Sequence, residues 1–180
     1  GFVQQAVQMA RVLRDQLFLN GYNAFTNPQS NSWGTVAEGC ALTAGIIGGL
    51  GGARCRTAAA HPIHNGLTQL EYKNKPLHGE LVGFGLLVQL DLEEKNSNSQ
   101  LPKQAKSQLI KFLTQLNIPI SVESIGLRNK TSNELYKACQ FACKDDSDIH
   151  KLPFPINEKD ILEAIQTYQV LPTDSNIRFK

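Results

Sequence analysis

Residues 81–92 read LVGFGLLVQLDL, and this stretch is apolar on nearly every side when it is drawn as a helix. A helix that is apolar all round is stable only when other helices cover it, because no face of it favours water. We therefore expect residues 81–92 to form a buried helix of an all-helical protein.

Helical spacing of apolar residues continues toward the N-terminus. A stripe at three- and four-residue intervals begins at Phe2 and predicts a helix that stops near Asn20 and Gly21, a pair typical of helix C-termini. Residues 33–50 suit a second helix, in which several glycines indicate close helix–helix or helix–ligand approach.

The C-terminal part shows the same pattern with clearer start signals. Residues 101–116 form an amphipathic helix, Thr131 and Glu134 make a capping box, and Asn157 caps a last helix. Strand-like alternation is absent, so we predict an all-α bundle of about seven to eight helices, with residues 1–180 as one domain.

The bulk composition excludes several classes of partner. The chain has 180 residues, a formal net charge of +2, 41% hydrophobic residues and 19% charged residues. This balance is that of a globular domain, and it argues against nucleic acid as a partner. Apolar runs fall short of the roughly 18 residues that span a bilayer, and no signal peptide is present, so we expect a cytoplasmic protein without a membrane partner. A start at Gly1 on a helical pattern indicates a piece of a longer chain.

Three of the four histidines lie in residues 58–80, AAAHPIHNGLTQLEYKNKPLHGE, at His61, His64 and His78. A spacing of three puts His61 and His64 on one helical face. Pro62 predicts a kink or break at His61. The seven-residue loop before His78 can extend to roughly 23 Å, so His78 can fold back beside His61 but need not do so.

These imidazoles have two possible roles. Two or three histidines with a carboxylate suit zinc or ferrous iron at an open catalytic site, and thiolates for a closed structural site are not nearby. Alternatively, the histidines are ordinary core and helix-cap residues that are close in sequence only. Spacing alone leaves both possibilities open.

Two motifs in order carry a family resemblance. GLGGARCRTAAAHPIHNGLTQLE (49–71) and LHGELVGFGLLVQL (77–90) resemble the C-terminal domain of the iron-containing alcohol dehydrogenase family, in its glycerol dehydrogenase-like branch. DIHKLPFPINEKDILEAI (148–165) resembles the last helix of that domain and its preceding turn. The resemblance covers nearly the whole chain and implies the all-helical C-terminal domain of the dehydroquinate synthase-like fold.

The resemblance implies roles for individual residues. His61 and His78 match the two histidines that hold a divalent metal, Zn²⁺ or Fe²⁺. His64 matches a histidine near the nicotinamide and the substrate, which implies a catalytic proton relay or a substrate contact. Glu80 would at most contact the metal ligands without binding the metal itself. The implied reaction is hydride transfer between an alcohol or polyol and NAD(P), in which the metal polarises the alcohol oxygen.

The resemblance also implies what this chain lacks. The third metal ligand, an aspartate, and the N-terminal α/β domain that binds NAD(P) precede this region in the family. The glycines of residues 46–52 do not replace that domain, because G-x-G-x-x-G is missing. We therefore expect the chain alone to be inactive, and we expect the N-terminal domain and a homo-oligomer among its partners.

Residues 52–56 depart from the family pattern. Relatives carry an aromatic residue there, followed by Glu, Ser, Gly and Gly, whereas this chain has Arg54 and Arg56 in GARCR. The two guanidinium groups either lie on a surface turn or bind an anionic substrate, a carboxylate or a phosphate. Two other functions therefore stay open: a helical binding or assembly domain without catalysis, and an enzyme for phosphorylated polyols in the same superfamily.

Overall fold

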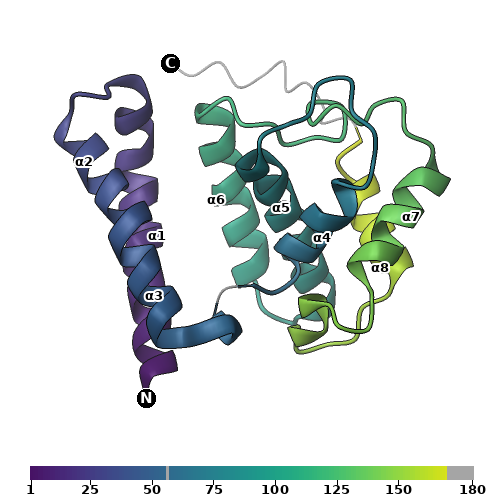
Figure 1. Cartoon of the computed structure of the whole chain (residues 1–180), viewed down its shortest axis with the longest axis horizontal. Helices are drawn as coiled ribbons and strands as arrows, with labels where there is room; N and C mark the ends of the chain where they lie inside the picture. The colour runs from purple at the N-terminus through teal and green to yellow at the C-terminus, as the bar shows by residue number, and fades with distance from the viewer. Residues whose placement is uncertain (56, 170–180) are drawn as a thin grey trace. The chain divides into compact units, whose positions relative to one another are not determined.

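The computed structural model describes residues 1–55 and 57–169, and every regular element in those residues is helical (Figure 1). This confirms the all-α prediction and the expected seven to eight helices. The α-helices are α1 (Phe2–Thr26), α2 (Asn31–Glu38), α3 (Ala44–Gly51), α4 (Ala60–Leu67), α5 (His78–Asn96), α6 (Leu101–Gln115), α7 (Ser132–Ala142) and α8 (Glu158–Gln166). Within this described part of the chain, no helix is both long and apolar enough to cross a membrane.

The chain divides into two compact units. The first comprises residues 1–57 and 111–117, and the second comprises residues 58–110 and 118–180. Helix α6 contributes its first ten residues to the second unit and the remainder to the first. The organisation of residues 1–180 as a single domain stays a prediction.

In the first unit, α1 packs along a second helical run made of α2, a π-helical segment (Gly39–Thr43) and α3 (Figure 1). The predicted helix over residues 33–50 is therefore present, with a wider turn in its middle. The predicted stop of α1 near Gly21 is wrong, since the helix continues to Thr26. Gly21 serves packing instead: a Cβ there would lie 2.6 Å from the ring of Phe112.

In the second unit, α5 is the buried helix that its apolar sequence predicts. Its inward side chains are fully covered, and Phe84 makes an edge-on contact with Tyr168 at 5.8 Å between ring centroids. Helix α4 packs against both α5 and α7, and α8 packs against the same two helices. The largest fully buried side chains of this core include Ile63, Leu67, Leu81, Phe84, Leu87, Leu92, Leu135, Ile161 and Ile165.

Helix α4 contains Pro62 in its first turn. The predicted kink at His61 is wrong, because the helix begins at Ala60 and Pro62 occupies its third position. The first-turn N–H groups of a helix have no partner within the helix, so a proline there removes no hydrogen bond. Its fixed φ also suits the first turn.

Two glycines bring the backbone of α4 into direct contact with its neighbours. A Cβ added at Gly85 of α5 would lie 2.5 Å from the carbonyl oxygen of Ala60, and a Cβ at Gly66 would overlap with the carbonyl oxygen of Ala138 in α7. In both cases the obstacle is backbone, which cannot rotate out of the way. These glycines therefore fix how closely α4 lies to α5 and α7.

We predict that Gly66→Ala destabilises the protein by about 1–3 kcal/mol, because the added methyl group must push α4 away from α7. Urea unfolding measures the loss. Gly79→Ala is the matched control, since a Cβ at Gly79 meets nothing within 4 Å. Equal stability of the two alanine variants would contradict the close contact between Gly66 and Ala138.

The capping box expected at α7 and the Asn157 cap expected at α8 are both confirmed. In the first, the backbone N–H and hydroxyl of Thr131 donate to Glu134, and Lys130 also donates to it. The Thr131 backbone N–H, then Lys130 and the Thr131 hydroxyl, lower the pKa of Glu134 from 4.5 to about 2. A lowered carboxylate pKa stabilises the fold above the unfolded pKa of 4.5, and this contribution is lost as the pH falls toward 2.

We therefore predict a pH-dependent effect of Glu134→Gln. The variant is less stable than the wild type at pH 7, and the difference shrinks as the pH falls from 4.5 toward 2, where the wild-type carboxylate takes up its proton. Urea midpoints of both proteins at several pH values measure this difference. A difference that stays constant over that range would show that the carboxylate charge at Glu134 does not contribute.

Candidate metal centre

Three histidines lie close together, two on α4 and one at the start of α5. His61 and His64 lie on α4, and His78 is the first residue of α5. The ring centroids of His61 and His78 are 5.9 Å apart, those of His64 and His78 are 4.4 Å apart, and those of His61 and His64 are 6.5 Å apart. The fold therefore realises the convergence that the sequence allowed but did not require.

Local sequence explains how the two helices present these rings. After α4 ends at Leu67, the chain turns at residues 68–70. The loop up to Leu77 then brings the start of α5 back beside His64. Glu80 then caps α5, since its carboxylate accepts a hydrogen bond from the Leu77 N–H at 2.7 Å. Glu80 thus fixes the helix start that carries His78 through this single hydrogen bond, because the side chain of the N-cap residue Leu77 cannot accept one in return.

Hydrogen bonds connect the side chains of Asn65, His64 and His78 in a row. The Asn65 carboxamide oxygen lies 2.9 Å from His64 Nδ1, and His64 Nε2 lies 3.0 Å from His78 Nδ1. A carboxamide oxygen only accepts, so His64 Nδ1 carries the proton and the Nε2 of the neutral ring accepts. The donor of that second bond is His78 Nδ1–H, which leaves the lone pair of His78 Nε2 free.

Burial and charge both favour the neutral form of His64. Its side chain is only 8% exposed, whereas His61 is half-buried and His78 is exposed. Burial is the main cause that lowers the pKa of His64 below 6.5, the hydrogen bond that His64 donates to Asn65 opposes it, and the charges of His78, His61 and Lys75 add to the lowering. A neutral ring is the form that the hydrogen-bonded row requires.

His61 and His78 fit a shared metal ion. Two imidazoles bound to one tetrahedral zinc ion have ring centres roughly 5 Å apart, near the 5.9 Å found here. The free Nε2 of His78 supplies one ligand atom, and its Nδ1–H has the second partner that metal-bound histidines usually have. Among the described residues, no three His, Cys, Asp or Glu side chains are arranged to hold a metal.

Arg54, one of the two arginines proposed for substrate binding, lies in the short 3₁₀ helix Gly52–Cys55, and the other, Arg56, falls outside the described residues. Both assignments stay predictions.

Two residues of the centre were missed from sequence. Asn65 directly follows His64, and its role depends on a side-chain hydrogen bond that the HNG motif does not specify. Gln89 reaches the first turn of α4 from 30 residues along the chain, and no local pattern signals such a contact.

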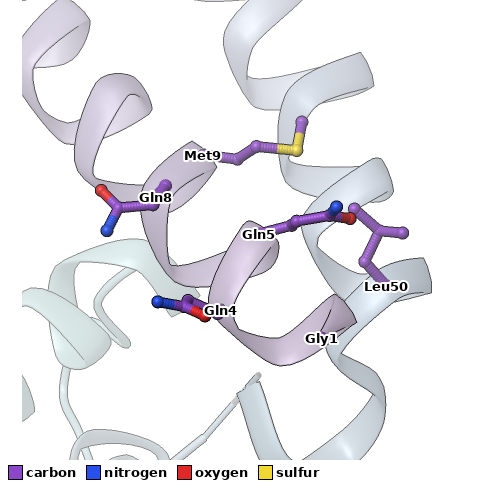
Figure 2. Close-up of a pocket in the computed structure, with 6 residues that line it drawn as sticks. All are labelled: Gly1, Gln4, Gln5, Gln8, Met9 and Leu50. Atoms are coloured by element: carbon purple, nitrogen blue, oxygen red, sulfur yellow. The ribbon is translucent and has the colours of Figure 1, made fainter.

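A depression of about 600 Å³ in the first unit offers no comparable chemistry (Figure 2). Figure 2 shows the amides of Gln4, Gln5 and Gln8 with Met9 and Leu50 around it. None of these side chains titrates, so they supply neither an acid nor a base.

Known proteins resemble this chain over most of its length, although no family model matches it. An uncharacterized oxidoreductase of Synechocystis sp. is 45% identical over 164 residues, which is 91% of this chain and 43% of that protein. A glycerol dehydrogenase of Thermotoga maritima is 32% identical over 161 residues, 89% of this chain and 43% of the relative. The crystal structure of glycerol dehydrogenase from Schizosaccharomyces pombe superposes with a TM-score of 0.78 at 29% identity, over 92% of this chain and 41% of that one.

These comparisons confirm the resemblance to glycerol dehydrogenases, whereas membership of the iron-containing family stays a prediction. The chain spans less than half the length of the relatives it matches. It is therefore an all-helical relative of one part of the dehydrogenases, and of glycerol dehydrogenases in particular.

Proposed function

We propose that this chain is the C-terminal, metal- and substrate-binding part of an NAD(P)-dependent alcohol or polyol dehydrogenase similar to glycerol dehydrogenase. The observation that carries the proposal is the position of His61 and His78, whose ring centroids lie 5.9 Å apart while Nδ1 of His78, and not Nε2, is bonded to His64. The dehydrogenase relatives support the same reaction class.

His61 and His78 would hold the divalent metal, Zn²⁺ or Fe²⁺, together with an aspartate from the preceding part of the protein. A metal held there would supply polarisation of the alcohol oxygen during hydride transfer to NAD(P), which the N-terminal domain would bind. His78 is exposed, so its ring is accessible to a substrate and to a partner domain.

His64 orients His78 in this proposal. Both of its ring nitrogens form hydrogen bonds: Nδ1 donates to Asn65, and Nε2 accepts from Nδ1–H of His78. Asn65 accordingly selects the tautomer of the row. A proton relay through His64 remains part of the proposal, because its bond to His78 gives a direct path to the centre.

Three further features belong to the same proposal: an anionic substrate bound through Arg54 or Arg56, a cytoplasmic homo-oligomer, and inactivity of this chain without its nucleotide-binding domain. A second candidate function is a binding or assembly domain that keeps the fold without catalysis.

We predict that the chain binds one Zn²⁺ ion weakly, through two imidazoles, and that His61→Ala and His78→Ala each abolish this binding. Isothermal titration calorimetry with zinc chloride measures it. His150→Ala is the matched control, since His150 is the fourth histidine and its Nε2 bonds to the carbonyl oxygen of Lys144 instead.

The same variants in the longer protein separate the two candidate functions. A dehydrogenase shows about one tight zinc or iron per chain, lost in both histidine variants. Absent metal, or metal that both variants keep, would contradict the enzyme and favour the binding domain.

We also predict that Asn65→Leu weakens zinc binding by about tenfold, because it removes the acceptor that fixes the tautomer of His64 and, through it, that of His78. The imidazole ¹⁵N chemical shifts report the tautomers directly. Gln69→Leu is the control, an exposed amide one turn further along that touches no imidazole. Unchanged shifts in Asn65→Leu would show that Asn65 does not set the tautomer.

A further inference from the structure

The side-chain amide of Gln89 lies at the N-terminus of α4, although Gln89 belongs to α5. Its Oε1 accepts hydrogen bonds from the backbone N–H groups of Ala59 at 3.1 Å and Ala60 at 3.0 Å. The helix that carries His61 and His64 is thus capped by a residue from the helix that carries His78.

Helix α4 needs this external acceptor. Its N-cap position is Ala59, whose side chain cannot accept a hydrogen bond, and Pro62 has no N–H. Ala59 is fully buried and Ala60 is 8% exposed, so water has little access to their N–H groups. A buried donor without a partner costs about 1–3 kcal/mol, and Gln89 removes that cost for both groups.

The orientation of the Gln89 amide is chemically determined. Its Nε2 donates to the Glu93 carboxylate at 2.8 Å, and a carboxylate only accepts. The oxygen must therefore point to α4, where only donors are present. Glu93 in this way holds Gln89, and Gln89 holds α4.

Three contacts define the position of α4 along α5. Gln89 binds the N–H groups at its start, Gly85 lies against the carbonyl oxygen of Ala60, and His78 bonds to His64 one turn later. Gln89 and His78 are 11 residues apart, which is roughly 16 Å along a helix, so the two contacts are widely separated. His61 directly follows the capped Ala60 and moves with it.

We infer that Gln89 is a positioning residue, which holds the start of α4 on α5 and so sets His61 at the separation from His78 that a shared metal ion requires. Gln89 itself touches neither imidazole nor metal. The inference rests on the proposed metal site for its function, whereas its geometric part concerns the histidines alone.

Gln89→Met tests the inference in the full 180-residue chain, because methionine keeps the length of the side chain and removes its amide. We expect at least a tenfold loss of Zn²⁺ affinity by calorimetry. In the metal-free chain we expect shifted imidazole NMR signals of His61 and His78, and faster hydrogen exchange of the Ala59 and Ala60 amides.

Asn157→Ala is the matched control for a purely structural effect. Asn157 also caps two backbone N–H groups with one amide oxygen, those of Lys159 and Asp160 at the start of α8. Its loss should lower the urea midpoint but leave the imidazole signals and the zinc affinity unchanged.

The double variant Gln89→Glu with Glu93→Gln should restore the wild-type zinc affinity and imidazole NMR signals. One oxygen of the new carboxylate accepts from Ala59 and Ala60, and the other accepts from the new amide at position 93, so all three hydrogen bonds re-form. Gln89→Glu alone sets two carboxylates against each other and should behave like Gln89→Met. This comparison decides the matter even where Gln89→Met does not fold.

Imidazole signals that remain at wild-type positions in Gln89→Met, while the Ala59 and Ala60 amides exchange faster, would overturn the inference. A double variant as impaired as the single Gln89→Glu variant would also overturn it. Absence of zinc binding in the wild type would contradict the proposed function alone, since the metal-free NMR signals still report whether Gln89 positions the histidines.

Discussion

The direct contact of the α4 backbone with two neighbouring helices is the constraint on which the candidate centre depends. Gly85 of α5 lies against the carbonyl oxygen of Ala60 in α4, and Gly66 of α4 lies against the carbonyl oxygen of Ala138 in α7. No side chain separates the backbones at either contact. Side chains at such interfaces can adjust by changing rotamer, whereas two backbones in contact cannot. The imidazoles on α4 are therefore held at fixed distances from the ring on α5, which a metal site needs to within a few tenths of an ångström.

Close packing of this kind has an electrostatic consequence. Burying the start of α4 removes water from N–H groups that no residue of the helix can satisfy, so an acceptor must come from elsewhere. The same burial lowers the pKa of His64 and keeps its ring neutral. Tight packing thus explains both the cap from Gln89 and the neutral row of Asn65, His64 and His78.

Sequence patterns predicted what local physics determines. The apolar stretch on α5, the capping box of α7 and the N-cap of α8 specify helices without reference to distant residues. The predictions made from Gly21 and Pro62 were wrong for a common reason. Each residue type has two structural uses, and only tertiary contacts distinguish them. Gly21 admits the ring of Phe112 rather than ending α1, and Pro62 lies in the first turn of α4 rather than bending it. Gln89 carried no signal at all, because its partners are 30 residues away.

A metal site with two ligands on one helical part and a third on another part has a functional logic. Two imidazoles alone bind a divalent ion more weakly than a full ligand set does, so a tight site forms only when both parts are in place. Hydride transfer requires the alcohol, the metal and the nicotinamide to meet at one point. In the proposed enzyme, a rigid α4–α5 pair that fixes His61 and His78 in advance would spare the partner domain from ordering them, and it would leave the exposed His78 accessible to the remaining ligand and the substrate.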